Sequence, residues 1–333
     1  MFDPGVVDDH DLLAPVEAQR SREVEGVLTS DRRPPGGDVI ARNEEARHAH
    51  SVGSGDRRVP CLPWPAVVEQ VRALAAGGIE LAVSIDGDGT DLLLIPGLGA
   101  SRSVYAPMVP ALSERCRVIV FDPRGVGESG VTDSPYTMAQ LAGDAVDVLD
   151  ACAVERAAVF GASMGGMVAQ HVALGWPDRV ARLLLGCTSA GGAHVVRADP
   201  EATRALLGKG ARTPEEAYRR ACTVLYSAAF QRAHDDVIEA QIRERARHPV
   251  GPRVFRAQYE AVRHHDTYDE LPRLRMPTLV LHGTEDAVMP PGNAEILAGR
   301  IPDARLQWFR GCGHLFFHED PPAATAAIAE FLG

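Results

Sequence analysis

The sequence predicts an α/β fold with a mostly parallel central sheet, helices on both faces of the sheet and a helical cap insertion. Short, continuous apolar runs such as Leu92–Ile95 and Ala157–Phe160 alternate with segments of helical spacing. Such runs are typical of strands that a parallel sheet buries on both faces. The alternation stops between Cys187 and Leu271, where several helical segments follow one another. An insertion there would cover the carboxyl ends of the strands, where ligands bind in such sheets.

The elements can be placed in chain order from their periodicity and from the turn residues between them. Strands are predicted at Ile79–Ile85, Leu92–Ile95, Arg117–Phe121, Ala157–Phe160, Val180–Leu185, Pro277–Leu281 and Ala304–Trp308. Helices of the sheet layers are predicted at Pro65–Ala76, Thr137–Ala151, Met164–Leu174, Gly292–Ala298 and Pro322–Leu332. Cap helices are predicted at roughly Pro200–Leu207, Pro214–Ala229, Asp235–Arg247 and Arg253–His264.

Composition divides the chain into two parts. Residues 1–60 mix Asp, Arg, Pro and Gly without sustained apolar periodicity. Such a stretch buries too little apolar surface to offset its ordering entropy, so a mostly disordered N-terminal extension is predicted. Residues 61–333 are predicted to form a single α/β domain, with the helical cap at about residues 188–272.

Charge and cysteine spacing exclude several classes of function. The net charge of −11 argues against a nucleic-acid-binding protein, because no excess of positive charge is available to neutralise phosphates. The six cysteines include no C-x-x-C pair, so neither a metal site nor a disulfide framework is expected. The N-terminal segment lacks the basic and apolar regions of a secretory signal, and no apolar run is long enough to cross a bilayer. We therefore expect a cytoplasmic protein that does not associate with membranes.

The clearest chemical motif is Gly161-Ala-Ser163-Met-Gly165, a G-x-S-x-G between a predicted strand and a predicted helix. A strand that reverses directly into a helix needs small neighbours around the turn and holds its central serine in a strained backbone conformation. The reversal exposes the Ser163 hydroxyl at the carboxyl edge of the sheet. It also places the serine at a helix N-terminus, which favours developing negative charge. Ser163 is therefore the predicted nucleophile.

A serine nucleophile needs a base and an acid that orients the base. His314 follows the last predicted strand, and Asp286 follows the strand Pro277–Leu281, so both lie on the same sheet edge as Ser163. The chain order Ser, Asp, His is the one that belongs to a G-x-S-x-G turn of this kind. Asp266 is an alternative acid, ranked below Asp286 because it precedes a strand and should lie at the opposite edge.

The oxyanion of an acyl-transfer reaction needs two backbone N–H donors. The residue after the nucleophile, Met164, should provide one of them. The turn Pro96-Gly-Leu98-Gly99 follows an earlier strand, and its Leu98 N–H is the candidate for the second donor. Glycines in this turn allow the backbone to approach a substrate closely.

From about residue 79 to the C-terminus, the sequence resembles the α/β-hydrolase superfamily. The matching pieces are LLLIPGLGASR, VIVFDPRGVGESG, VFGASMGGMVAQ, PTLVLHGTEDAVMP and GCGHLFFHEDP. The resemblance is nearest to 3-oxoadipate enol-lactonase-like and carboxylesterase members. It implies the α/β-hydrolase fold and a triad of Ser163, Asp286 and His314. Pro96 departs from the pattern, since many members carry a histidine there; the backbone donor is unaffected.

The resulting functional prediction is a serine hydrolase that cleaves a carboxylic ester, lactone or thioester of a small molecule, without metal or organic cofactor. Carbon–carbon bond hydrolysis on the same triad and a non-catalytic binding protein on this scaffold stay open as alternatives. Cap aromatic residues are candidates for the substrate pocket: Tyr218, Tyr226, Phe230 and Tyr259. Neither the natural substrate nor the oligomeric state follows from the sequence.

Overall fold

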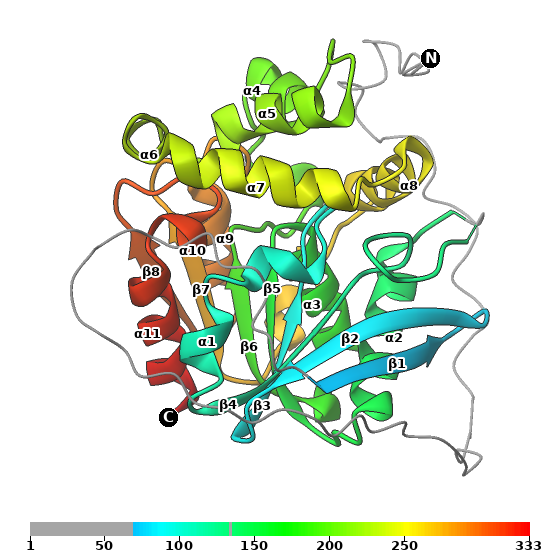
Figure 1. The fold of residues 1–333 in the computed structure, drawn as a ribbon. Coiled ribbons are helices and arrows are strands. Elements are labelled where there is room, and N and C mark those ends of the chain that lie inside the picture. Colours follow the sequence, from blue (N-terminus) through cyan, green and yellow to red (C-terminus); the bar gives the residue numbers. More distant parts are fainter. Residues whose placement is uncertain (1–68, 133–134) are drawn as a thin grey trace, which may run out of the picture. The chain divides into compact units, whose positions relative to one another are not determined.

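Eight strands form one sheet in the part of the chain that the computed structural model describes, residues 69–132 and 135–333 (Figure 1). The strands are β1 (Glu69–Ala75), β2 (Ile79–Asp86), β3 (Thr90–Ile95), β4 (Cys116–Phe121), β5 (Ala157–Ala162), β6 (Val180–Gly186), β7 (Thr278–Gly283) and β8 (Ala304–Phe309). Their order across the sheet is β1-β2-β4-β3-β5-β6-β7-β8. β2 runs antiparallel to β1 and β4, and every pair from β4 to β8 is parallel. The predicted α/β class and mostly parallel sheet are confirmed.

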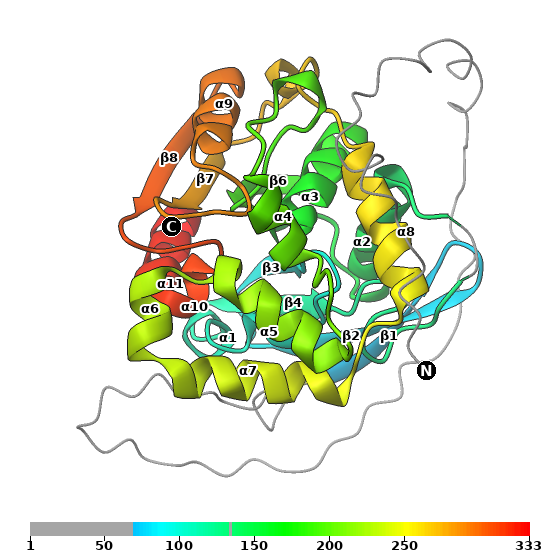
Figure 2. The same ribbon diagram turned by 90° about the horizontal axis from the view of Figure 1, so that it is seen from above.

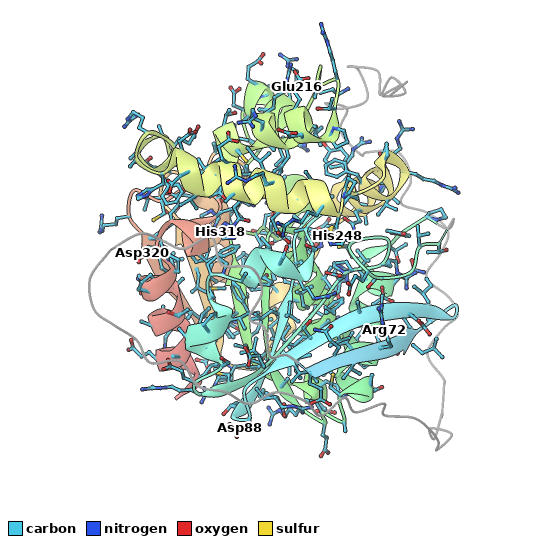
Figure 3. The ribbon with its side chains drawn as sticks, viewed as in Figure 1. Arg72, Asp88, Glu216, His248, His318 and Asp320 are labelled. Atoms are coloured by element: carbon cyan, nitrogen blue, oxygen red, sulfur yellow. The ribbon has the colours of Figure 1, made fainter. Side chains whose placement is uncertain are left out.

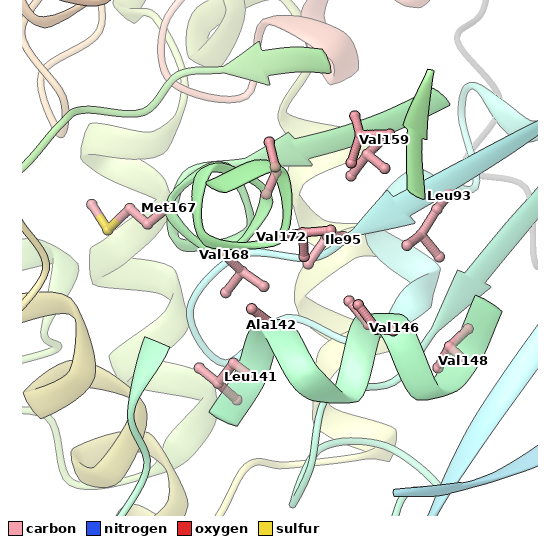
Figure 4. Packing of buried hydrophobic residues seen from close by; sticks show 14 of the residues in the cluster. Leu93, Ile95, Leu141, Ala142, Val146, Val148, Val159, Met167, Val168 and Val172 are labelled. Carbon is pink, nitrogen blue, oxygen red and sulfur yellow. The ribbon is translucent and has the colours of Figure 1, made fainter. Parts of the chain in front are cut away.

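Helices cover both faces of the sheet. The helices of the sheet layers are α1 (Val109–Leu112), α2 (Met138–Ala151), α3 (Met164–Gly175), α9 (Gly292–Arg300), α10 (Phe316–Glu319) and α11 (Pro321–Leu332). Leu93 and Ile95 of β3 belong to the core on the α2 and α3 side (Figure 4). Their neighbours Leu92 and Leu94 belong to the core that includes residues of α1 and α11. This alternation follows from the two-residue period of a strand, and it explains the continuous apolar run.

The segment Pro65–Ala76 differs from its prediction. Residues 69–75 form strand β1 rather than a helix, and β1 pairs with β2 from Glu69 opposite Ile85 to Ala75 opposite Ile79. Ala73 and Ala75 are buried while Leu74 between them is 69% exposed, so the burial has the period of a strand. The helical interpretation was wrong because tertiary pairing with β2 decides the conformation of this short segment.

The cap lies over the edge of the sheet as a group of successive helices (Figures 1 and 2). These are α4 (Pro200–Leu206), α5 (Pro214–Leu225), α6 (Ala228–Ala233), α7 (Asp235–Arg247) and α8 (Pro252–Arg263). They interrupt the chain between β6 and β7, as the sequence predicts.

One predicted cap helix, Pro214–Ala229, is divided into α5 and α6. Tyr226 is extended at the break (φ −114°, ψ 149°), and the Ser227 side chain caps α6 by accepting the Phe230 N–H. Glu319 holds the break in place, because its carboxylate accepts both the N–H and the hydroxyl of Ser227, at 2.7 and 2.6 Å. A contact between residues 92 positions apart therefore sets this boundary.

The predicted disordered extension, residues 1–60, lies outside the described residues. Within residues 69–132 and 135–333, no helix is long and apolar enough to cross a membrane.

Candidate active site

Ser163 is the single residue between the end of β5 and the start of α3, and its backbone is strained. Its φ of 58° and ψ of −122° lie where few non-glycine residues occur. The Ser163 N–H donates to the Gly186 carbonyl at 2.8 Å, and the Ser163 carbonyl accepts the Thr188 hydroxyl at 2.7 Å and the Gly166 N–H at 2.9 Å. Strand β6 and the residues after it thus hold the turn in a conformation that the serine alone would not adopt.

The glycines around Ser163 are required by close backbone contacts. A Cβ atom on Gly161 would lie 2.0 Å from the Gly165 carbonyl oxygen, and one on Gly165 would lie 2.0 Å from the Ile95 carbonyl oxygen. Both distances are far inside van der Waals contact. The small residues of the G-x-S-x-G motif are therefore a steric condition for the turn.

His314 and Asp286 lie side by side in the loops that follow β8 and β7. The His314 Nδ1 atom is 2.8 Å from the Asp286 Oδ2 atom, and both side chains are buried. The other carboxylate oxygen of Asp286 accepts the N–H groups of Val288 and Met289, each at 2.8 Å. Because a carboxylate only accepts, Nδ1 carries the hydrogen and Nε2 of neutral His314 is left as the basic nitrogen.

His282 of β7 also contacts Asp286, a contact that the sequence reading missed. Its Nε2 atom lies 2.7 Å from the Met289 carbonyl oxygen and 3.3 Å from Asp286 Oδ2. Both partners are acceptors, so Nε2 carries the hydrogen. Burial lowers the pKa of His282, which keeps the ring neutral. The sequence signal was available, since this histidine stands four residues before Asp286 at the end of a predicted strand.

The three predicted triad residues lie at the same sheet edge, where the parallel strands β5, β7 and β8 end. A hydrogen bond joins His314 to Asp286, but none of the hydrogen bonds among the described residues joins Ser163 Oγ to His314. Catalytic hydrogen bonds are often long without substrate and tighten in the Michaelis complex. The structure thus joins the candidate acid and base directly and brings Ser163 to the same edge of the sheet.

The alternative acid, Asp266, does not contact His314. It is exposed and pairs with Gly191, in the segment that leaves β6. Its carboxylate accepts the Tyr268 N–H at 3.3 Å. The bridge to Gly191 places Asp266 beside the segment that leaves the carboxyl end of β6, so its expected position at the opposite edge is not confirmed; the acid that bonds the His314 ring is Asp286.

The turn after β3 lies against the serine. The Ala100 N–H donates to the Gly97 carbonyl at 3.1 Å, and Gly99 has a φ of 61°. A Cβ atom on Gly97 would lie 3.3 Å from Ser163 Cβ and 3.8 Å from Ser163 Oγ. Neither the Leu98 N–H nor the Met164 N–H donates to any residue that the structure describes, and their role as oxyanion donors stays a prediction. The Gly99 N–H is occupied, because it donates to Gln258 Oε1 at 2.8 Å.

The four aromatic pocket candidates lie in two settings. Tyr226 and Phe230 are buried and stacked, with ring centroids 5.4 Å apart, and the Tyr226 hydroxyl lies 3.0 Å from His318 Nδ1. Tyr218 and Tyr259 are half-buried, and the Arg245 guanidinium lies 4.5 Å from the centre of the Tyr218 ring. A pocket role for all four stays a prediction.

Cys312 and metal-binding clusters are two other possible sources of reactivity near the site. Burial and the neighbouring carboxylates raise the pKa of the Cys312 thiol to about 12, so a thiolate nucleophile is not available two residues from His314. Among residues 69–132 and 135–333 no cluster of three or more His, Cys, Asp and Glu side chains could hold a metal ion.

Comparison with known proteins gives the family. Residues 92–321 match the model of the alpha/beta hydrolase fold family. The chain is 31% identical over 259 residues to the "Putative carbamate hydrolase RutD" of Azorhizobium caulinodans, covering 77% of this chain and 96% of the relative.

Solved structures agree with this match. The enol-lactonase of Burkholderia xenovorans is 29% identical, with a TM-score of 0.69 over 78% of this chain and 99% of that one. The thermophilic esterase of Thermogutta terrifontis is 31% identical, with a TM-score of 0.68 over 80% of this chain and 98% of that one. With its sheet, its strained serine turn and its paired histidine and aspartate, the chain belongs to the α/β-hydrolase family of hydrolytic enzymes.

Proposed function

We propose that this protein is a serine hydrolase that cleaves a carboxylic ester, lactone or thioester of a small molecule through an acyl-serine intermediate. The observation that carries the proposal is the 2.8 Å contact of His314 Nδ1 with Asp286, at the sheet edge where the strained turn exposes Ser163. This contact fixes the tautomer in which His314 Nε2 can accept a proton.

The reaction would proceed in two halves. His314 takes the proton of Ser163 Oγ as the oxygen attacks the substrate carbonyl, and then delivers that proton to the leaving group. A water molecule, deprotonated by the same imidazole, attacks the acyl-serine and releases the acid. Asp286 stabilises the imidazolium that forms in each half, and the free N–H groups of Leu98 and Met164 would bind the oxyanion.

The same candidate triad is compatible with more than one kind of scissile bond. The same groups can hydrolyse a carbamate or a carbon–carbon bond next to a carbonyl, because both reactions pass through a tetrahedral oxyanion. We propose ester-type bonds first, since the enol-lactonase and the esterase share the fold over nearly their whole length. We expect the reaction to take place in the cytoplasm.

The test is labelling by a fluorophosphonate probe, together with turnover of p-nitrophenyl acetate and butyrate. The wild type should label and turn over both esters, and Ser163→Ala should do neither while retaining its melting temperature. Ser113→Ala is the matched control, because the Ser113 hydroxyl donates to the Pro110 carbonyl, away from the candidate triad residues. A folded wild type that neither labels nor turns over esters would reject the proposal in favour of a binding protein. A wild type that labels but hydrolyses only carbamates or carbon–carbon bonds would correct the bond and keep the triad.

A further inference from the structure

A cap side chain hydrogen-bonds the turn that carries the candidate oxyanion donor. The turn Gly97–Ala100 has two adjacent backbone donors at its centre, on Leu98 and Gly99. The Gly99 N–H donates to Oε1 of Gln258 at 2.8 Å, and this bond is buried. The Leu98 N–H has no acceptor among the described residues. One donor is thus held by the cap and its neighbour is left free beside Ser163.

Gln258 comes from α8, 159 residues after Gly99, and is 0% exposed. Other cap side chains also lie close to Gly99. A Cβ atom on Gly99 would lie 2.8 Å from Nη2 of Arg245, on α7, and 3.0 Å from the ring of Phe255, on α8. The cap therefore packs directly on the outer side of this turn.

The amide of Gln258 has one hydrogen bond where it could have several. The Gly99 N–H needs an acceptor, so Oε1 faces the turn and the orientation of the amide is fixed. The Nε2 atom is then buried without a partner among the described residues. A buried, unpaired NH₂ group is unfavourable, and an apolar side chain of similar size would avoid this cost. Packing alone therefore does not account for a glutamine here, whereas the bond to Gly99 does.

The backbone of the turn explains what this bond can do. Gly99 adopts a φ of 61°, as the third position of a type II turn requires. Glycine readily adopts other conformations, so the peptide between Leu98 and Gly99 could rotate and turn its N–H elsewhere. An acceptor fixed on the cap opposes that rotation, and with it a shift of the adjoining Leu98 N–H.

We infer that Gln258 is a positioning residue that holds the oxyanion turn, so that correct seating of the cap is coupled to the direction of the Leu98 N–H. The inference rests on the proposed function, because it assigns Gln258 a role in the same acyl-transfer site. Gln258 does not touch the reacting atoms. It acts through its hydrogen bond to the Gly99 peptide.

The test compares Gln258→Leu, which removes the acceptor, with Gln258→Glu, which keeps an oxygen at the same reach. With p-nitrophenyl butyrate, Gln258→Leu should lower kcat at least tenfold and leave KM within about twofold, because an oxyanion donor acts mainly in the transition state. A boronic acid that forms a tetrahedral adduct should bind more weakly by a similar factor. Gln258→Glu should recover most of kcat. Gln258→Met is the second apolar variant should Gln258→Leu fail to fold.

The matched control is Gln231→Leu. Gln231 is another cap glutamine, and its amide donates to the Thr223 and Tyr226 carbonyls within the cap. It should keep wild-type kcat. Equal losses of kcat in Gln231→Leu and Gln258→Leu would overturn the inference, since they would indicate general damage to the cap. So would wild-type kcat in a folded Gln258→Leu protein.

Hydrogen exchange of the peptide that contains residues 97–100 separates this inference from the proposed function. Gln258→Leu should accelerate exchange of one amide there, whether or not the protein hydrolyses esters. Loss of Ser163-dependent labelling in the wild type would reject the proposed function. Unchanged exchange in Gln258→Leu would reject the contact itself.

Discussion

The Nε2 atom of His282 lies 3.3 Å from Oδ2 of Asp286, the carboxylate oxygen that also contacts His314 Nδ1 at 2.8 Å. Asp286 accepts three hydrogen bonds, one from His314 and two from the backbone N–H groups that reach Oδ1. The His282 ring, bonded to the Met289 carbonyl, lies next to Oδ2, so the orientation of Asp286 is constrained from several directions. The candidate acid of the triad is thus set by its own strand as well as by its loop.

His282→Leu is expected to lower kcat about tenfold. The variant loses the hydrogen bond to the carbonyl of Met289, whose own N–H bonds Asp286 Oδ1, and a neutral hydrogen bond is worth roughly 0.5–1.5 kcal/mol. Ester turnover would be measured alongside the melting temperature. His264→Leu, at an exposed position of the cap, should retain full activity. Unchanged kcat in a folded His282→Leu protein would show that the loop alone orients Asp286.

Asp286→Asn is expected to lower kcat by roughly 10³–10⁴-fold, because an amide cannot hold the His314 tautomer that leaves Nε2 basic. The turn and the oxyanion donors stay in place, so KM should change little. Asp266→Asn is the matched control, since that carboxylate is exposed and does not contact His314. If Asp266→Asn were the variant that lost activity, the assignment of the acid would be wrong.

Gly165→Ala is expected to destabilise the fold by roughly 2 kcal/mol or more, as overpacking against immovable backbone does. Its Cβ would lie 2.0 Å from the Ile95 carbonyl oxygen. Gly143→Ala provides the contrast, because Gly143 lies within α2 and its Cβ would meet nothing within 4 Å. It should stabilise the protein by roughly 0.5–1 kcal/mol, the helix preference for alanine. Urea midpoints of the two variants should therefore move in opposite directions.

Acid should destabilise the protein through His318, which lies at the boundary between the cap and the sheet layers (Figure 3). Its Nε2–H donates to the Val104 carbonyl at 2.7 Å, and Nδ1 contacts the Tyr226 hydroxyl. Burial lowers the pKa of His318 to about 4. In the unfolded chain the pKa is about 6.5, so the unfolded state binds more protons between these values and stability falls as the pH falls.

For His318 alone, the expected loss is about 2 kcal/mol from pH 7.5 to pH 5. His265 acts in the same direction, since burial lowers its pKa to about 3. Urea unfolding at the two pH values would measure the slope. His318→Gln should reduce it, whereas His264→Gln, at an exposed position, should not. Equal slopes in the wild type and His318→Gln would contradict the prediction.

Local sequence patterns were sufficient for most of the sheet and for naming the residues of the candidate site. Strands buried on both faces leave continuous apolar runs, which is why β3 to β7 could be placed from residues such as Leu92–Ile95. The serine turn could be recognised because its steric requirements fall within five consecutive residues, from Gly161 to Gly165. The parallel arrangement then brings the residues after β5, β7 and β8 to one edge.

The tertiary structure decided what depends on contacts between distant residues. β1 is a strand because β2 pairs with it, although residues 69–75 alone also fit a helix. The cap helix breaks at Tyr226 because Glu319 binds Ser227. His282 and Gln258 gained their importance in the same way, by reaching Asp286 and Gly99. By itself the sequence determined the class of the fold and the candidates for the site, because local periodicity and local sterics indicate both. Only the folded chain determined which polar groups support the site, because long-range hydrogen bonds leave no periodic mark on the sequence.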